Sequence, residues 1–453
     1  MELEERARDS ADNCIACTSC IAACPVTKAN PEYKGPKLVG PAHSRMHFSD
    51  PSDYEDTLML CSNCKNCDIT CPNGVSVSTL NMLERGRYLK AHPEAHKPED
   101  KMLSHGFEMA DMLNKIPFGK SLANLGMSIG EALGVMGAMG MAPERKTPRY
   151  ASVYFRDLFK TIKQPSSDKK VLFFPGCYID TNEPWVGTAF VQVMNENGYE
   201  VLMDNRFVCC GSPLVVGGYL DEARQHADTN VAIIQEYAQK GIPVVACCTS
   251  CSLMLKNEYT ELFAQSEMKE AAKNVWDAFE FLTMLAEEGK LKKVTINSDH
   301  KFIYHAPCHL RAQGMGLPAF DLLKAAGLNV VNADAGCCGM SGSYGFHKDN
   351  YETSMKIGQA LFDAINADNY HKVICDCGTC RMQIQHGTDT KAVHPIEILA
   401  KAYKKLNKIS FVCYNNKCEV NDTKSDGVVK CFCFQIGVSF INKTKCFLRG
   451  AFQ

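Results

Sequence analysis

The sequence predicts an α+β multidomain chain, in which a small helical module precedes a duplicated α/β region. Eight cysteines lie in two tight runs before residue 90, where little β-branched strand pattern is present. After residue 168, apolar strand-like runs alternate with helix-like runs, a pattern typical of α/β layering. With 453 residues and 45% hydrophobic composition, the chain is long enough to bury several cores.

Composition and charge exclude several kinds of function. The formal net charge is −2 and no block of Lys or Arg forms a binding arm, so we expect no nucleic-acid partner. The segment Met1 to Arg6 lacks the basic start and apolar run of a secretory signal, which predicts a cytoplasmic protein. In a reducing compartment, 25 cysteines favour metal or redox chemistry over a disulfide framework.

Shifts in composition divide the chain into five predicted segments. They are a helical module (1–95), a connector rich in Met, Gly and Ala (96–168), two copies of a repeated unit (169–290 and 291–406) and an atypical tail (407–453). In the module, Ser78 is predicted to cap a helix that runs to about Tyr88, with its apolar side formed by Leu80, Met82, Leu83 and Leu89. The tail receives no predicted function, and its cysteines show no paired spacing: Cys413, Cys418, Cys431, Cys433 and Cys446.

The connector contains one long, weakly polar stretch from Lys120 to Ala142. Within it, glycine recurs every fourth residue as in close-packed helices, at Gly126, Gly130 and Gly134. Asn124 and Glu131 argue against a helix that spans a membrane. The stretch is predicted either to contact a membrane surface or a partner subunit, or to be a simple packed connector.

The two early cysteine runs share one spacing, Cys-x-x-Cys-x-x-Cys-x-x-x-Cys-Pro, which is the bacterial two-cluster ferredoxin pattern. Three thiolates of a run converge on one 4Fe-4S cluster, while the fourth, ahead of a helix-breaking proline, ligates the other cluster. The spacing therefore predicts two crossed ligand sets. The first ferredoxin set is Cys14, Cys17, Cys20 and Cys71, and the second ferredoxin set is Cys61, Cys64, Cys67 and Cys24. Zinc sites or disulfides are the alternative, and this doubled spacing is far more specific than a lone Cys-x-x-Cys.

The α/β region carries the same cysteine pattern twice. Each copy has a strand that delivers a cysteine, then a Cys-Cys-Gly turn, then a second strand followed by Cys-x-x-Cys. The corresponding segments are 171–177 and 302–308, 209–211 and 337–339, and 244–251 and 373–380. The first Cys-Cys-Gly set is thus Cys177, Cys209, Cys210, Cys248 and Cys251, and the second Cys-Cys-Gly set is Cys308, Cys337, Cys338, Cys377 and Cys380.

Adjacent cysteines followed by glycine suit a bridged multi-metal centre. Glycine tolerates positive φ, so that two thiolates share one tight turn and backbone N–H groups approach bound sulfide. A structural zinc or unliganded core cysteines remain the alternative for either copy. Cys247 and Cys375 are predicted to be buried strand thiols. His305, His309 and His394 are expected to be structural, although His309 could donate a proton near a redox centre.

Several segments resemble a known group of iron-sulfur subunits, which join a two-cluster ferredoxin module to two Cys-Cys-Gly domains. The group includes the glycolate oxidase iron-sulfur subunit, lactate-utilisation proteins and heterodisulfide reductase subunits. The segments 13–15, 30–37 and 342–346 are most similar to the family of the iron-sulfur subunit, designated C, of anaerobic glycerol-3-phosphate dehydrogenase. The resemblance extends from about residue 13 to residue 405, so the predicted fold becomes a helical two-cluster 4Fe-4S ferredoxin-like module followed by a duplicated, heterodisulfide-reductase-like α/β region.

The resemblance implies an electron-transfer subunit rather than a catalytic one. Such a subunit accepts electrons from flavin-containing dehydrogenase subunits, passes them to membrane quinone and lies peripherally on the inner face of the cell membrane. It also implies noncubane 4Fe-4S clusters in the Cys-Cys-Gly domains, in addition to the two 4Fe-4S clusters. No Gly-x-Gly-x-x-Gly follows a strand, so the chain has no predicted dinucleotide site. The rivals are a subunit of glycolate or lactate oxidation, a catalytic heterodisulfide-reductase-type subunit and a zinc-stabilised scaffold.

Overall fold

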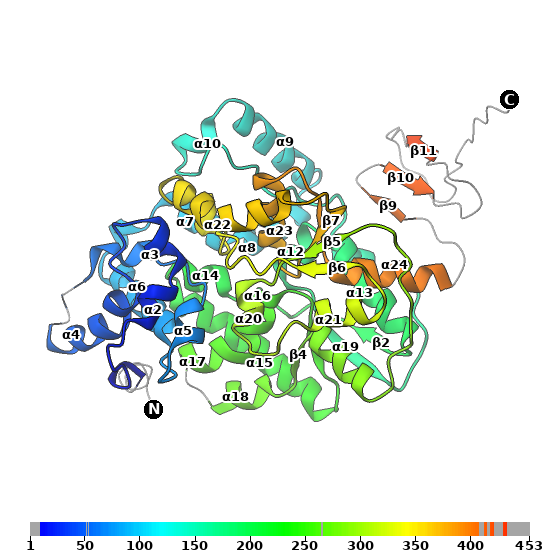
Figure 1. Cartoon of the computed structure of the whole chain (residues 1–453), viewed down its shortest axis with the longest axis horizontal. Helices are drawn as coiled ribbons and strands as arrows, with labels where there is room; N and C mark the ends of the chain where they lie inside the picture. The colour runs from blue at the N-terminus through cyan, green and yellow to red at the C-terminus, as the bar shows by residue number, and fades with distance from the viewer. Residues whose placement is uncertain are drawn as a thin grey trace. The chain divides into compact units, whose positions relative to one another are not determined.

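The computed structural model describes residues 10–50, 52, 54–263, 266–406, 412–414, 417–420 and 429–432 (Figure 1). Its contacts form two compact units, Met1–Tyr403 and Lys404–Gln453. The second unit contains a three-stranded antiparallel sheet in the order β11-β10-β9, built from β9 (Val412–Tyr414), β10 (Lys417–Val420) and β11 (Val429–Phe432). Of the tail cysteines, Cys433 and Cys446 lie outside the described residues.

The N-terminal module is helical, as the sequence predicts. Its helices are α2 (Ser19–Ala23), α3 (Pro25–Ala29), α4 (His43–Ser49), α5 (Asn66–Thr70) and α6 (Val77–Ala91). Pro25 opens α3, where its missing N–H and fixed φ are harmless. The predicted cap was wrong: Ser76 precedes α6, and Ser78 lies in the first turn, where its N–H donates to Asp68 Oδ1 at 2.7 Å. The helix is also buried on most sides rather than on one.

The connector folds into short helices beside the repeated region. These are α7 (Pro98–Ser104), α8 (Gly106–Lys115), α9 (Gly119–Ala132), α10 (Val135–Ala138) and α11 (Phe155–Phe159). Figure 1 shows α9 and α10 at an edge of the first unit. The predicted close packing at the glycines is wrong for Gly126, because a Cβ there would meet no described atom within 4 Å. Among the described helices, none is both long and apolar enough to cross a membrane.

The duplicated region forms two four-stranded parallel sheets with the same strand order, β2-β1-β3-β4 and β6-β5-β7-β8. The first contains β1 (Lys170–Phe174), β2 (Glu200–Leu202), β3 (Val244–Ala246) and β4 (Val275–Asp277). The second contains β5 (Phe302–Tyr304), β6 (Val330–Asn332), β7 (Lys372–Ile374) and β8 (Ala392–Val393). The matching order confirms the predicted duplication and fold class.

Helices cover both faces of these sheets, as buried parallel strands require. In the first copy they are α12 (Gly176–Thr181), α13 (Pro184–Glu196), α14 (Ser212–Val216), α15 (Leu220–Gln239), α16 (Thr249–Leu253), α17 (Tyr259–Phe263), α18 (Ser266–Ala272) and α19 (Ala278–Glu287). In the second copy they are α20 (Cys308–Arg311), α21 (Pro318–Ala325), α22 (Tyr351–Asn366), α23 (Gly378–Gly387) and α24 (Pro395–Leu406). Every residue of β3 and β5 is buried, so these central strands lie inside the fold.

Candidate functional site

The two cysteine runs of the helical module adopt the same loop conformation. Ala16 and Thr18 of the first run have positive φ, and so do Asn63 and Lys65 at the same places in the second run. Such conformations are uncommon for residues other than glycine and persist where the surrounding structure holds them. Both loops therefore curl in the same way, and each turns its first three cysteines toward one centre.

The four cysteines of the first ferredoxin set line one small cavity, which is where the crossed arrangement predicts them. Its lining includes Cys14, Cys17 and Cys20 of the first run together with Cys71 of the second. This cavity is close to solvent, because Cys17 and the neighbouring Ile15 are exposed. The N–H of Val75 donates to Cys71 Sγ at 3.3 Å, a contact of the kind that tunes cluster potential.

The second ferredoxin set is buried. Burial first, and then the charges of Asp68, Cys64, Cys61 and Cys24, raise the pKa of the Cys67 thiol well above its usual value. Cys24 thus lies with the second run rather than with its own. The Asn81 side-chain amide donates to Cys61 Sγ at 3.3 Å. Because iron binds the thiolate, assembly in this buried site must release protons.

The thiols of the two Cys-Cys-Gly sets are arranged alike. In each copy, every thiol lies within hydrogen-bonding range of the next, in the orders Cys177–Cys209–Cys210–Cys251–Cys248 and Cys308–Cys337–Cys338–Cys380–Cys377. In the first copy, hydrogen bonding from Cys209 lowers the pKa of Cys210 to about 6. Thiols clustered in this way suit a metal centre, although ligation by either set stays a prediction.

The glycine of each Cys-Cys-Gly turn has the predicted positive φ, +85° at Gly211 and +87° at Gly339. A Cβ at Gly339 would lie 2.1 Å from the carbonyl oxygen of Ser354, so the turn cannot accept a side chain. The turn also directs N–H groups at sulfur. The N–H of Gly339 lies 3.4 Å from Cys337 Sγ, and that of Met340 lies 3.5 Å from Cys338 Sγ.

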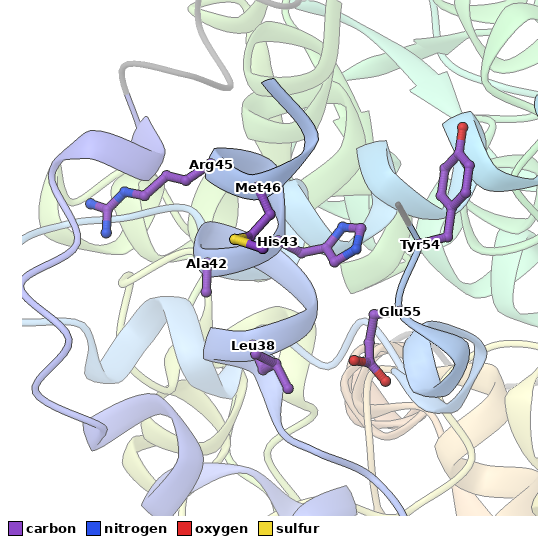
Figure 2. A pocket seen from close by; sticks show the side chains of 7 residues that line it. All are labelled: Leu38, Ala42, His43, Arg45, Met46, Tyr54 and Glu55. Carbon is purple, nitrogen blue, oxygen red and sulfur yellow. The ribbon is translucent and has the colours of Figure 1, made fainter. Parts of the chain in front are cut away.

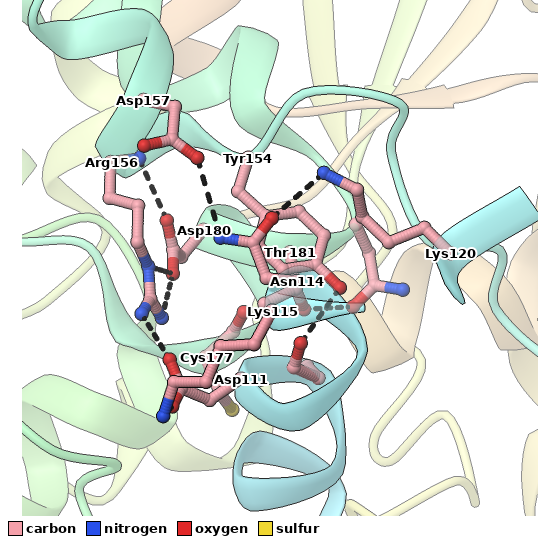
Figure 3. A network of polar contacts seen from close by, with 12 residues as sticks. Asp111, Asn114, Lys115, Lys120, Tyr154, Arg156, Asp157, Cys177, Asp180 and Thr181 are labelled. Atoms are coloured by element: carbon pink, nitrogen blue, oxygen red, sulfur yellow. Dashed lines mark hydrogen bonds and ion pairs between the residues drawn. The ribbon is translucent and has the colours of Figure 1, made fainter. Parts of the chain in front are cut away.

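The carboxyl ends of the strands position the other thiols, because parallel strands of one sheet end at the same edge. Cys177 and Cys308 follow β1 and β5, and the two Cys-x-x-Cys segments follow β3 and β7. The connector supports this edge in the first copy (Figure 3). Arg156 donates to Asp180 at 2.7 Å and to Asp111 of α8 at 2.8 Å, and Asp180 lies on the helix that begins beside Cys177.

The second ferredoxin set adjoins the second Cys-Cys-Gly set. Cys64 belongs to one buried cluster with Cys308 and Cys337. His309, which follows Cys308, lies 2.8 Å from Oγ of Ser250 in the Cys-x-x-Cys segment of the first copy, so the two Cys-Cys-Gly sets lie next to each other. The chain therefore arranges its sets in the spatial order first ferredoxin, second ferredoxin, second Cys-Cys-Gly and first Cys-Cys-Gly.

Two of the three singled-out histidines are satisfied structural residues. His309 bridges three segments, through Nδ1 to Ser250 Oγ at 2.8 Å and through Nε2 to the Asn63 carbonyl at 3.1 Å. His394 Nε2 donates to the carbonyl of Cys247 at 2.8 Å. His305 differs, because its buried Nε2 has no hydrogen-bond partner among the described residues. Burial lowers the pKa of His305 to about 4, so this imidazole is neutral at physiological pH.

An ion pair that the sequence did not predict fastens the helical module to the first copy. Lys65 Nζ lies 2.7 Å from Glu258 Oε1, and both side chains are almost fully buried. Burial opposes both charges, yet Glu258 raises the pKa of Lys65 and Lys65 lowers the pKa of Glu258. A single sequence offers no signal for such a pair, because its two residues are far apart in the chain.

Two of the segments that carry the family resemblance, 30–37 and 342–346, lie near the second ferredoxin set. Tyr33 and Tyr344 are both buried, and burial followed by the charge of Cys61 raises the pKa of each. A separate cavity of about 410 Å³ lies within the module and is lined by side chains from residues 38–46 and 54–55 (Figure 2). Arg45, in its lining, donates to the carbonyl of Cys14 at 3.0 Å, so the cavity lies near the first ferredoxin set.

Comparison with known proteins agrees with these arrangements. A family model described as a 4Fe-4S dicluster domain matches residues 10–75, and one described as a cysteine-rich domain matches residues 171–256 and 302–385. The subunit designated C of anaerobic glycerol-3-phosphate dehydrogenase from Escherichia coli K12 is 35% identical over 403 residues, which cover 87% of this chain and 98% of that protein. The chain belongs to the family of this dehydrogenase subunit. Its dicluster domain implies two 4Fe-4S clusters.

Other proteins that are similar to this chain are subunits of different enzymes. The subunit designated B of fumarate reductase (CoM/CoB) from Methanothermobacter marburgensis is 27% identical over 413 residues, covering 86% of this chain and 72% of that protein. The glycolate oxidase iron-sulfur subunit of Escherichia coli is 22% identical over 411 residues, covering 86% and 94% respectively. The chain is thus an iron-sulfur subunit of an oxidoreductase complex, and its partner subunits follow from its family.

Proposed function

We propose that this chain relays electrons from flavin-containing dehydrogenase subunits to membrane quinone, and that its donor complex oxidises glycerol 3-phosphate. The observation that carries the proposal is the buried contact of Cys64 with Cys308 and Cys337, which joins the ferredoxin module to the repeated region. The names of the Escherichia coli dehydrogenase relatives supply the donor substrate. When bound, the clusters provide one-electron sites, while the protein fixes their order and tunes their potentials.

Exposure supports a direction for this relay. Ile15 is 63% exposed and Cys17 is exposed, so a partner subunit can approach the first ferredoxin set. Cys61, Cys64 and Cys67 are each only 7% exposed, so the second ferredoxin set is shielded and reaches the repeated region internally. Electrons are therefore expected to enter at the first ferredoxin set and to leave through the Cys-Cys-Gly sets.

The relay is tested by separating donor oxidation from quinone reduction. In a complex reconstituted with the flavin subunits, Cys337→Ser should leave reduction of an artificial dye by glycerol 3-phosphate intact and slow quinone reduction about tenfold or more. Cys247→Ala, which removes a buried thiol outside all four sets, should change neither rate. Oxidation of glycerol 3-phosphate by this chain alone, or equal loss of both activities in an assembled complex, would favour the catalytic rival.

The acceptor is dissolved in lipid, and the connector offers an apolar face that suits a membrane surface. Leu122, Leu125 and Ile129 follow helical spacing along α9, Phe118 and Leu133 flank its two ends, and all five side chains are at least 50% exposed. The face is paired with no described element. We assign it to peripheral contact with the inner face of the cell membrane, since exposed apolar helix faces bind the lipid interface.

Vesicle flotation tests this contact. The double variant Leu122→Glu/Ile129→Glu should lower the vesicle-bound fraction of the full chain at least about tenfold, since burying each apolar side chain contributes about 1.5–3 kcal/mol. Ile69→Glu is the matched control, because Ile69 is 49% exposed on the helical module. Equal flotation of wild type and double variant on phosphatidylcholine and phosphatidylglycerol vesicles would contradict the assignment.

A further inference from the structure

The two Cys-Cys-Gly copies differ at one pair of positions next to their thiols. In the first copy, Phe174 and Ala246 are register partners at the ends of β1 and β3. The same register continues one residue past Tyr304 and Ile374 in the second copy, where it brings His305 and Cys375 side by side. The N–H of His305 donates to the Ile374 carbonyl at 2.9 Å and holds this alignment. An apolar pair in one copy is thus replaced in the other by two side chains that are able to bind a metal ion.

His305 and Cys375 lie next to the second Cys-Cys-Gly set. A nitrogen of His305, Cys375 Sγ and Cys380 Sγ all lie within 4.8 Å of one another, and all three residues are buried. Cys380 Sγ also lies 3.1 Å from Cys338 Sγ, so the pair is continuous with the chain of thiols. In the first copy, Phe174 instead packs on Phe207, with ring centroids 5.0 Å apart.

One buried nitrogen of His305 lacks a partner. Among the described residues, His305 Nε2 has no hydrogen-bond partner although the side chain is only 2% exposed. A polar atom is costly to bury without a partner, and an imidazole beside soft thiolates is a good ligand for iron. Imidazole replaces cysteine as an iron ligand in some iron-sulfur centres, so such a ligand set is chemically sound.

We propose that the two Cys-Cys-Gly centres are not equivalent, and that the second one takes His305 and Cys375 as additional iron ligands. This inference rests on the proposed function, because it requires an iron centre in the second copy. The first centre has five candidate thiols, whereas the second has six thiols and one imidazole. The difference gives the second centre a nitrogen ligand and hence a spectroscopic signature of its own.

The first copy supplies the matched variants. His305→Phe and Cys375→Ala install the residues that the first copy already carries at these positions, so each should fold. In the anaerobically purified full chain labelled with ¹⁵N-histidine, pulsed electron paramagnetic resonance should detect nitrogen coupled to the second centre. The coupling should vanish in His305→Phe, and Cys375→Ala should speed iron loss to a chelator about tenfold or more. The reciprocal pair Phe174→His/Ala246→Cys should add a second nitrogen coupling.

The number of iron and zinc atoms per chain distinguishes a failure of the proposed function from a failure of the present inference. Iron that does not exceed about eight atoms per chain would remove the Cys-Cys-Gly centres and with them the proposed relay. Iron above that number without histidine coupling in the wild type, or with coupling that persists in His305→Phe, would overturn only the present inference. One zinc per chain that both variants lose would also overturn it, because the three residues would then form a separate zinc site.

Discussion

In a Cys24→Ser variant we expect loss of the buried cluster of the second ferredoxin set, although Cys24 lies in the first run. The reason is that Cys24 lies close enough to Cys64 and Cys67 for its charge to raise their pKa values, while the first three cysteines of its own run share a cavity with Cys71. The reciprocal Cys71→Ser should remove the exposed cluster instead. Each variant should lower the iron content by about four atoms per chain and abolish one of two reductive signals.

The identity of the missing signal decides this prediction. Two measurements on the anaerobic chain distinguish the solvent-near centre from the buried one. They are reduction of an artificial dye, which needs no quinone, and electron paramagnetic resonance. Cys247→Ala is the control, because its buried thiol belongs to none of the four sets and its loss should leave the iron content unchanged. If each variant lost only the cluster of its own run, the crossed ligation would be wrong and the module would not be a two-cluster ferredoxin.

Glu258→Ala should strongly destabilise the fold. It leaves the ammonium of Lys65 buried without its main partner, and breaking a buried ion pair in this way costs about 3–5 kcal/mol. The pair also makes stability depend on pH. Since Lys65 lowers the pKa of Glu258 in the fold, this contribution is present above the ordinary glutamate pKa and is lost as pH falls.

The midpoint of thermal unfolding of the anaerobic holoprotein measures this effect. Glu236→Ala, which breaks exposed pairs with Lys240 and Arg206, should leave the midpoint unchanged. The double variant Lys65→Met/Glu258→Met should recover most of the loss, because replacing both buried charges with apolar groups is often neutral. A midpoint of Glu258→Ala equal to that of the Glu236 control would show that the ion pair does not fasten the module.

Sequence reasoning reached the site where the signal is local. Metal ligands on one loop need fixed spacing, so both ferredoxin runs and the Cys-Cys-Gly turns were recognisable, and the positive φ of Gly211 and Gly339 is confirmed. Sequence reasoning failed where the start of a helix or the contacts of a residue depend on tertiary packing. Ser78 has the chemistry of a helix cap, but Asp68 accepts its N–H and α6 begins at Val77. Gly126 fits the spacing of a packed helix, but a Cβ at this position would meet no described atom within 4 Å.

The sequence by itself determined the duplication, the fold class and the family and predicted the candidate ligands, because each rests on residues close together in the chain or on alternation along it. Only the tertiary structure decided the order of the four sets, the ion pair of Lys65 with Glu258 and the meeting of His305 with Cys375. These features join segments that are distant in sequence. Sheet register and domain packing bring such segments together, and neither is encoded in the spacing of a single motif.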